Sequence, residues 1–429
     1  MKKKLCIALI AVMLLAVSMP TLSACTSRED TLKIYNCAEY IGEDVIDQFK
    51  EYYKSVTGKQ ISIVYDEYDT NETMHSKVAI KKSDYDVICA SDYMIERMLR
   101  EELLLEQSPL GNDQDGNPIQ DYRKVNISKY FLDNTVNNFT YDPSGKYSTP
   151  YMWGTMGIVY ATDAVSLEYL ESKGWGALWD TAYKNRVNMK KSVRDTYAVG
   201  AIYTFCNQSS ANFDANITPE QALNNVAKAS AVQQSLVWQK QNVKCGYETD
   251  EGKSDIIEGK VDMALQWSGD AIYSMGELQE ELGISRSLDY YVPQEGSNVW
   301  VDCWAIPKYA KNTVAANLWI NFLCQEDIAI ENMEWIGYTS CVATQATFDW
   351  CQGYYDDNDN FVAYTEEDYD ASDLSYFFGG ELSEQAKSII VDPAQFPSLD
   401  VVKRCGVMSD FGEENTKIID SVWANVLNA

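Results

Sequence analysis

Short apolar segments that alternate with segments of helical spacing are the feature that most constrains the fold of this chain. Residues 32–35, 61–65 and 86–89 are predicted as strands, and residues 45–55 are predicted as a helix that ends near Gly58. Glycine is a common residue just beyond the last turn of a helix. This alternation predicts an α/β fold with a parallel, doubly wound sheet.

A second series of strands and helices follows in the rest of the chain. Residues 218–221 combine a capping threonine, a first-turn proline and a third-position glutamine, which together predict a helix start. With 429 residues the chain is too long for one typical core, so two α/β lobes are expected. The other segments are predicted strands at residues 157–161, 187–189, 263–265, 289–292 and 303–306, and a final helix at residues 413–426.

The first 25 residues have the layout of a secretory signal. Three lysines precede an apolar run over residues 5–17, which is too short to span a bilayer, and small residues precede Cys25. The segment resembles a bacterial lipoprotein signal, which is cut before the cysteine. We therefore expect residues 1–24 to be removed, Cys25 to carry acyl chains, and residues 25–30 to tether the protein outside the cytoplasm. An ordinary signal peptide with a chance cysteine is the alternative.

The mature chain has a strongly acidic composition. The sequence has 35 basic and 64 acidic residues, and removal of three lysines with the signal leaves 32 against 64, a formal charge of −32. Nucleic acid and anionic lipid are poor partners for such a surface, whereas a cationic ligand suits it. Because charge kept for solubility explains the same composition, only carboxylates inside a cleft separate the two interpretations.

The cysteines and the histidine argue against disulfides, zinc and histidine-dependent catalysis. Beyond Cys6 and Cys25, nine cysteines are scattered without a Cys-x-x-Cys pair, and His75 is the only histidine. An odd, unpatterned set in an exported chain indicates buried thiols more than a disulfide framework. Zinc needs closely spaced ligands, and acid–base catalysis most often uses histidine. The nine are Cys37, Cys89, Cys206, Cys245, Cys303, Cys324, Cys341, Cys351 and Cys405.

Residues 354–373 are predicted to form an acidic surface insertion. Four side chains in it have the spacing of a calcium loop, but Phe361 occupies the place where such loops need glycine. We therefore expect no metal and no cofactor. The four residues are Asp356, Asn358, Asn360 and Glu367.

Three short segments pair an aromatic side chain with a carboxylate at the ends of predicted strands. Strand ends are where open α/β sheets place their ligand crevices. An aromatic face attracts an ammonium group and a carboxylate pairs with its charge, so the combination suits an aliphatic amine. Packing in the core beside a helix cap is the structural alternative for each segment. The pairs are Tyr40 with Glu39, Trp267 with Asp270, and Trp300 with Asp302.

From about residue 32 to its C-terminus, the chain resembles the spermidine/putrescine-binding proteins that deliver polyamines to ABC importers. The resemblance rests on seven motifs that occur in the same order. They are Tyr-Asn-Cys-Ala-Glu-Tyr at 35–40, Tyr-Asp-Thr-Asn-Glu-Thr-Met at 68–74, Tyr-Asp-Val-Ile at 85–88, Ser-Asp-Tyr at 91–93, Pro-Tyr-Met-Trp-Gly at 150–154, Asp-Cys-Trp-Ala-Ile-Pro at 302–307 and Ile-Gly-Tyr at 336–338.

The resemblance implies a two-lobed type II periplasmic binding protein, in which each lobe is a doubly wound sheet and the polyamine lies between the lobes. The implied crossovers fall near residues 154–157 and 299–302. It also implies a monomer that is not an enzyme and that works with ABC permease subunits and a separate ATPase. The implied limits are residues 31–154 plus 300–342 for the first lobe, and residues 155–299 plus 343–429 for the second.

Residue-by-residue matching to the family gives the candidate ligand-binding side chains. Asp270 completes a Trp-x-Gly-Asp motif that resembles the putrescine branch, and Asp195 falls on an acidic position of the family. The remaining matches to ligand-contact positions are Glu39, Tyr40, Ser91, Tyr93, Trp267, Trp300, Asp302 and Tyr338.

Three positions depart from the family pattern. Cys37 stands where the family usually has tryptophan, Ser192 replaces an aspartate used by spermidine binders, and Met408 replaces a polar contact. With Asp270, these changes move a carboxylate from one end of the implied cleft toward the other. We therefore expect putrescine to be slightly favoured over spermidine.

Some of the matched segments also have a purely structural interpretation. Trp153 and Trp304 are expected in the core, Tyr40 fits either role, and residues 71–73 are expected to start a helix without touching ligand. Asp302 is the strongest candidate, because a carboxylate buried on a strand that crosses between lobes needs a cationic partner.

Two other functions remain open on the sequence alone. A binding protein for another solute is the first, and the charge of the cleft distinguishes it: inward carboxylates favour a cation, whereas arginines favour an anion. A glycoside hydrolase is the second, because two carboxylates in a tryptophan-rich cleft can act as acid and base.

Overall fold

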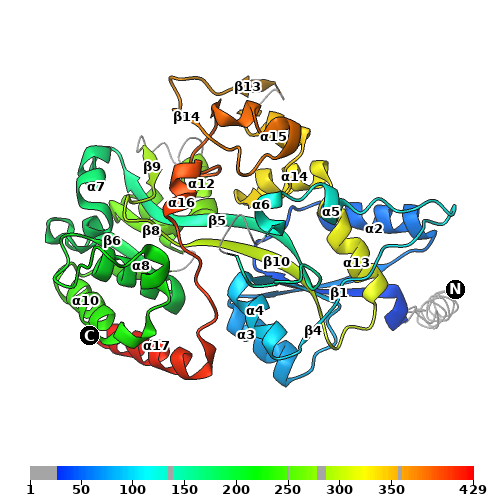
Figure 1. Cartoon of the computed structure of the whole chain (residues 1–429), viewed down its shortest axis with the longest axis horizontal. Helices are drawn as coiled ribbons and strands as arrows, with labels where there is room; N and C mark the ends of the chain where they lie inside the picture. The colour runs from blue at the N-terminus through cyan, green and yellow to red at the C-terminus, as the bar shows by residue number, and fades with distance from the viewer. Residues whose placement is uncertain (1–26, 134–138, 249–250, 278–286, 356–359) are drawn as a thin grey trace, which may run out of the picture.

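Two α/β lobes lie side by side in the computed structural model, joined by long strands that run through both (Figure 1). The structure describes residues 27–133, 139–248, 251–277, 287–355 and 360–429. The predicted signal, Cys25 and the first part of the tether lie outside these residues, as do Asp356 and Asn358 of the acidic insertion.

A single sheet of 11 strands, counted over the described residues, extends across both lobes. The strands at the periphery pair in parallel, β1 with β2 and β3, and β6 with β7 and β8. In spatial order the main strands are β2 (Ser62–Tyr68), β1 (Thr31–Cys37), β3 (Val87–Ser91), β10 (Val299–Pro307), β5 (Ser148–Ala161), β8 (Met263–Trp267), β6 (Val187–Lys190) and β7 (Gly246–Glu248). Three shorter strands complete the sheet: β4 (Leu104–Leu105) pairs with β10, whereas β9 (Leu288–Tyr291) and β11 (Thr339–Ser340) pair with β5.

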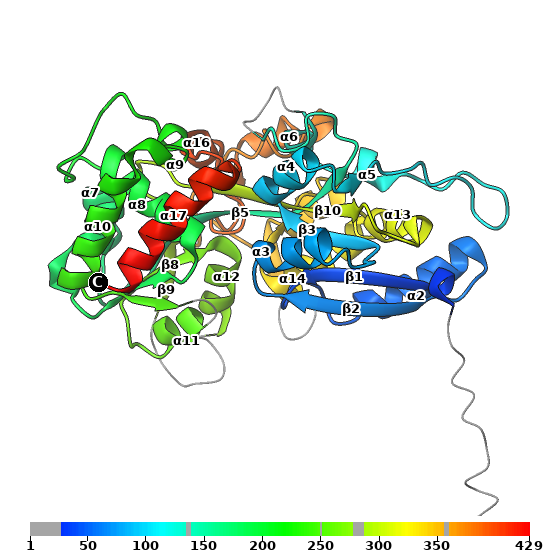
Figure 2. The ribbon, with the colours of Figure 1, turned by 90° about the horizontal axis from the view of Figure 1, so that it is seen from below.

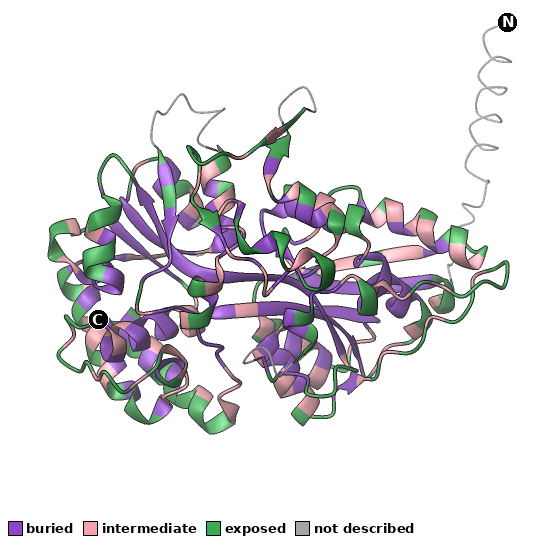
Figure 3. Ribbon diagram, turned by 45° about the horizontal axis from the view of Figure 1, so that its top comes forward, coloured by how far each residue is buried: buried purple, intermediate pink, exposed green. Residues whose placement is uncertain are grey.

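The two central strands, β5 and β10, connect the lobes. They pair antiparallel from Val299 opposite Thr155 to Ala305 opposite Ser148, and β5 then continues into the second lobe beside β8 and β9. Every residue of β5 is buried (Figure 3). These strands agree with the crossovers implied near residues 154–157 and 299–302.

The sheet is mixed, which corrects the prediction of a parallel sheet. Strand β10 is antiparallel to β3 and to β5, and β5 is antiparallel to β8 and β9. The difference arises because β5 and β10 cross the molecule in opposite directions. The alternation of strands and helices along the sequence predicts the pairing only of strands that follow each other through a helix.

Helices cover both faces of the sheet in each lobe (Figures 1 and 2). The first lobe has α2 (Val45–Thr57), α3 (Asn71–His75), α4 (Asp92–Arg100), α5 (Tyr122–Val125), α6 (Lys129–Leu132), α13 (Thr313–Phe322) and α14 (Glu326–Ile336). The second has α7 (Leu167–Lys173), α8 (Val193–Cys206), α9 (Pro219–Leu223), α10 (Ala229–Asn242), α11 (Glu251–Ile257), α12 (Ser268–Glu277) and α17 (Gly412–Leu427).

Several helix boundaries confirm the sequence predictions. Gly58 follows α2 in the left-handed conformation, with φ 70°, and its N–H donates to the Lys54 carbonyl. Thr218 and Gln221 form the predicted reciprocal capping box at the start of α9, although that helix has only five residues. The predicted final helix is α17, which packs on α10 and α8.

A third region, above the lobe junction in Figure 1, contains α15 (Gln345–Trp350) and two hairpins, and the chain then returns to the second lobe through α16 (Leu399–Arg404). Its Phe377 stacks on Trp153 with ring centroids 5.8 Å apart. Residues 343–400 thus share a core with residues predicted for the first lobe, and the limits of the lobes stay a prediction. The hairpins are β12 (Gly353–Tyr355) with β13 (Phe361–Ala363), and β14 (Ala371–Ser372) with β15 (Ile389–Ile390).

The cores of the lobes contain large aromatic side chains. Trp304 and Trp319 pack edge to face in the first lobe, and Trp175 is fully buried in the second. Trp153 has no exposed surface, so it and Trp304 are core residues, as predicted. The nine cysteines beyond Cys25 are all free thiols, seven of them buried. Over the described residues, no helix combines the length and apolarity that crossing a bilayer requires.

Candidate ligand-binding site between the lobes

The candidate site forms where β1, β3 and β10 meet at the junction of the lobes. Because β10 runs antiparallel to β3, Asp302 near its start lies opposite Ser91 at the end of β3. Tyr40 follows the end of β1, as predicted. Trp300 and Asp302 lie inside β10, which corrects the prediction that they follow a strand end. Because β10 runs antiparallel to β3, these two residues nevertheless lie at the edge of the sheet where β1 and β3 end.

Asp302 is a buried carboxylate held by neutral donors. It is 7% exposed, and it accepts hydrogen bonds from the Tyr40 hydroxyl at 2.8 Å and the Ser91 hydroxyl at 2.6 Å. Burial, together with the charge of Asp195, raises the pKa of its carboxyl to about 6, although the hydrogen bonds from Ser91 and Tyr40 oppose the shift. Of the residues the structure describes, none forms an ion pair with Asp302. A cation between the lobes would therefore find its counter-ion here.

Asn71 supports this arrangement through two hydrogen bonds with Ser91. Its amide donates to the Ser91 hydroxyl at 2.9 Å, and its side-chain oxygen accepts from the Ser91 N–H at 3.2 Å. The Thr70 side chain caps α3, so residues 71–73 start a helix as predicted. Asn71 thus fixes the hydroxyl that Ser91 presents to Asp302.

Aromatic rings surround the carboxylate. The Tyr338 ring packs against Tyr40, with centroids 5.4 Å apart and the planes 79° apart, and against Trp300, with centroids 5.5 Å apart. Tyr338 follows Gly337, which ends α14 in the left-handed conformation with φ 75°. Gly269 allows the close approach of the Tyr338 ring, because a Cβ there would lie 2.2 Å from a ring carbon.

Asp270 is the second carboxylate of the site, and it already has a cationic partner. The Lys190 ammonium lies 2.5 Å from its Oδ2 atom and 3.9 Å from the centroid of the Trp267 ring. The side chains of Lys190 and Asp270 are 2% and 8% exposed. Tyr338 donates to the Oδ1 atom at 3.1 Å, which links Asp270 to the first lobe.

Asp195 lies in the first turn of α8, on the side of the second lobe. Ser192 caps this helix by accepting a hydrogen bond from the Asp195 N–H, so the serine at the departing position has a structural role. Burial raises the pKa of the Asp195 carboxyl, whereas hydrogen bonds from Ser192 and Trp267 and the charges of Lys190 and Arg194 oppose that shift.

Two further contacts join the lobes beside the site. The Arg194 guanidinium of α8 stacks on the Tyr93 ring of α4, 3.7 Å from its centroid. Glu39 has a left-handed backbone, with φ 54°, and an 84% exposed side chain whose carboxylate lies 3.8 Å from the Lys253 ammonium. Glu39 therefore lies at the rim, and Tyr93 lies on the inner face of the junction.

The structure thus gathers most of the candidate residues around two carboxylate centres, Asp302 and Asp270, whereas Glu39 lies at the rim and Tyr93 contacts Glu72 and Arg194. Their contact with a ligand stays a prediction. Sequence reasoning missed Lys190 and Lys253, which pair with Asp270 and Glu39. Lys190 is the last residue of β6, and a charged residue at the carboxyl end of a strand was the signal that could have revealed it.

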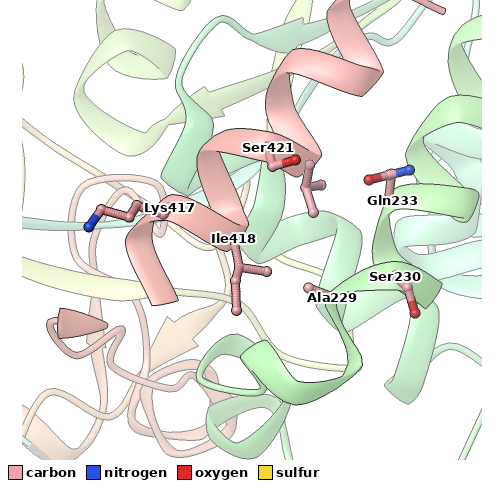
Figure 4. A pocket seen from close by; sticks show the side chains of 7 residues that line it. Ala229, Ser230, Gln233, Lys417, Ile418 and Ser421 are labelled. Carbon is pink, nitrogen blue, oxygen red and sulfur yellow. The ribbon is translucent and has the colours of Figure 1, made fainter. Parts of the chain in front are cut away.

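A separate hollow lies on the second lobe between α10 and α17 (Figure 4). Lys417 is the only charged residue among those that line it, and the lining contains neither a carboxylate nor an aromatic ring. It therefore lacks the groups that recognise an amine. The lining residues are Ala229, Ser230, Gln233, Lys417, Ile418, Ser421 and Val422.

Known proteins of similar sequence bind solutes outside the cytoplasm. The spermidine/putrescine-binding periplasmic protein of Salmonella typhimurium is 29% identical over 319 residues, which cover 74% of this chain and 79% of that protein. The putrescine-binding periplasmic protein SpuD of Pseudomonas aeruginosa is 27% identical over 310 residues, covering 70% of this chain and 75% of that protein.

Solved structures share the fold over nearly the whole chain. The spermidine/putrescine ABC transporter substrate-binding protein PotD from Streptococcus pneumoniae has a TM-score of 0.61 and 26% identity, and the match covers 93% of this chain and 99% of that one. The TpPotD lipoprotein of Treponema pallidum, at 20% identity, has a TM-score of 0.64 with 92% and 99% coverage. The two-lobed fold predicted from the resemblance is confirmed.

The family itself follows from a match over most of the sequence. A family model for bacterial extracellular solute-binding proteins matches residues 44–370. Its members are the substrate-binding components of transporters, so the interpretation as a glycoside hydrolase is excluded and the protein is not an enzyme. The chain belongs to the family of bacterial extracellular solute-binding proteins.

Proposed function

We propose that this protein is a receptor that captures a polyamine between its lobes and delivers it to an ABC importer, with putrescine slightly favoured over spermidine. The observation that carries the proposal is Asp302, a buried carboxylate with neutral hydrogen-bond donors and aromatic neighbours. An alkylammonium group would supply the missing charge, and the Trp300 and Tyr338 rings would flank its methylene groups. The names of the similar proteins point to the same class of ligand.

The rest of the proposed site follows from the position of Asp302. Ser91 and Tyr40 orient the carboxylate, and Asp195 supplies a second negative charge from the other lobe. Because the ligand would then contact both lobes, its binding would favour the closed arrangement over an open one. Contacts such as Tyr338 with Asp270 would form on the same closure.

We further propose that the protein acts as a monomer at the outer face of a membrane. Cleavage before Cys25 and acylation of its thiol would anchor the chain, and residues 25–30 would form a tether between the anchor and the lobes. Its partners would be ABC permease subunits with a separate ATPase. The similar proteins are named as periplasmic, which agrees with a place outside the cytoplasm.

Calorimetric titration of residues 26–429 with putrescine, spermidine, spermine and cadaverine tests this function. We expect at least one of them to bind with a dissociation constant of about 1 μM or tighter, about −8 kcal/mol. All titrations use the same salt concentration, because ionic strength screens the acidic surface. If none of the four gives heat or raises the melting temperature, the site binds another solute and the proposed function is wrong.

Polyamine binding is expected to weaken as the pH falls below about 6, because burial raises the pKa of the Asp302 carboxyl from 3.8 to about 6. Protons then compete with the ligand for the carboxylate, and each further unit of acidity lowers the affinity up to about tenfold. Titrations at about pH 7.5 and about pH 5 should therefore give dissociation constants that differ by roughly tenfold.

The variant Asp302→Asn is the control for this pH dependence. Burial also raises the pKa of the nearby Asp92 carboxyl to about 7, and that group remains in the variant. The variant should lose the change centred near pH 6, and any change that remains should come from Asp92, whose pKa is lower once the charge of Asp302 is removed. Wild-type dissociation constants that agree within about twofold over this range would contradict the role of Asp302.

A further inference from the structure

Lys190 is a buried lysine beside the proposed ligand. Its side chain is 2% exposed, at the carboxyl end of β6. Lysine is almost never buried to this degree unless it is paired. Here the pairing group is Asp270, which sequence comparison assigned to the ligand instead.

The surroundings of the Lys190 ammonium are those of a bound amine. A carboxylate oxygen of Asp270 lies 2.5 Å from it, and the face of the Trp267 ring lies 3.9 Å from it. The Tyr338 hydroxyl of the first lobe donates a hydrogen bond to the other carboxylate oxygen of Asp270. A carboxylate and an aromatic face are the two groups that recognise a primary ammonium. A side chain of the protein therefore occupies an ammonium position of the site.

Of the buried carboxylates matched to ligand positions, two remain for the ligand. Asp302 has hydrogen bonds from hydroxyl groups, and Asp195 has hydrogen bonds from Ser192 and Trp267. Neither carboxylate is in an ion pair within the described part of the chain. The two act on each other, because the charge of Asp195 raises the pKa of the Asp302 carboxyl. Two ammonium groups would neutralise this pair, and a third would meet the positive charge of Lys190.

We propose that Lys190 is a specificity-determining residue, which fills one ammonium position of the site and restricts the ligand to diamines. The inference rests on the proposed function. A triamine would have to place its third ammonium beside the Lys190 ammonium, where like charges repel and Asp270 is already paired. Discrimination against spermidine thus comes from a charge that the protein supplies itself.

The experiment compares Lys190→Met with wild type by calorimetric titration of putrescine and spermidine. Methionine keeps the unbranched stem of the side chain and removes its charge, which leaves Asp270 free for a third ammonium. We expect the preference for putrescine over spermidine to fall at least tenfold in the variant. A preference that stays within about threefold of wild type would overturn the proposal.

Lys191→Met is the matched control, because Lys191 is the next residue and is exposed. It removes the same charge from the same segment, so it should leave the preference within about twofold of wild type. The double variant Lys190→Met/Asp270→Asn removes the freed carboxylate as well, and it should not gain affinity for spermidine. A gain in the Lys191 variant equal to that in the Lys190 variant would show a general effect of charge and overturn the inference.

Wild-type protein gives an independent test if Lys190→Met does not fold. The inference makes the preference for diamines larger than the slight one of the proposed function, because it requires putrescine or cadaverine to bind at least tenfold tighter than spermidine. Spermidine binding as tight as that of the diamines would overturn the role of Lys190 and leave the polyamine receptor intact. Absence of binding by every polyamine would instead overturn the proposed function.

Discussion

Replacing Asp302 with asparagine is expected to weaken polyamine binding by roughly 30-fold to several thousandfold. The substitution keeps the shape of the side chain and removes the charge that pairs with a desolvated ammonium, which costs about 2–5 kcal/mol. Tyr40 donates to one carboxylate oxygen and Ser91 to the other, so the amide oxygen keeps one of these donors and the second hydroxyl faces the amide NH2 group. Calorimetric titration of the best-binding polyamine measures the effect.

An exposed aspartate is the control for this experiment. Asp349 on α15 is exposed and accepts a hydrogen bond from Gln345 of the same helix, so Asp349→Asn should change the dissociation constant by less than about twofold. The ligand-free Asp302→Asn protein should melt no lower than wild type, because a neutral side chain replaces a buried carboxylate. Affinities of the Asp302 variant within about threefold of wild type would show that Asp302 is not the counter-ion.

The sequence was sufficient to predict most of the local structure. The strands that became β1, β2, β3, β8 and β9 were placed within about three residues, because hydrophobic pattern and cap residues are local signals. The pairing of β5 with β10 could not be predicted in this way. The paired residues of β5 and β10 are separated by more than a hundred residues of sequence, and the relative direction of the two strands depends on how the lobes are joined.

The site was predicted in part for the same reason. Tyr40, Ser91 and Asp302 lie in three predicted segments, and the structure joins them by hydrogen bonds. The ion pair between Lys190 and Asp270 spans 80 residues of sequence and was missed. A motif identifies a carboxylate that can bind an amine, but it does not show whether a side chain of the protein already occupies that carboxylate.

Glu39 shows how the backbone redirects a predicted contact. Its motif placed it beside Tyr40, yet the left-handed conformation at Glu39 directs the two side chains differently. Tyr40 is 6% exposed and reaches Asp302, whereas the Glu39 side chain is 84% exposed and lies near Lys253 of the other lobe. Glu39 thus lies at the rim, where solvent weakens its ion pair with Lys253.

Asp270→Asn is expected to destabilise the ligand-free protein by about 3–5 kcal/mol, because removal of one partner leaves the other charge buried and unpaired. The Lys190 side chain is 2% exposed and has its 2.5 Å ion pair with Asp270. Denaturant unfolding measures the change, provided that the slope of the transition is the same in both proteins. The same unpaired ammonium would repel a polyamine, so affinity should fall as well.

An ion pair on the surface is the control that distinguishes the cost of leaving a charge buried and unpaired from the cost of losing an ion pair. Asp47 lies 2.6 Å from Lys50, but its side chain is 80% exposed, so Asp47→Asn should cost less than about 1 kcal/mol. In the double variant Lys190→Met/Asp270→Asn, no buried charge remains from the pair, and most of the lost stability should return. Equal costs for the Asp47 and Asp270 variants would mean that the Lys190 ammonium reaches water when its partner is removed. The site would then lack the fixed internal charge on which discrimination between diamines and triamines depends.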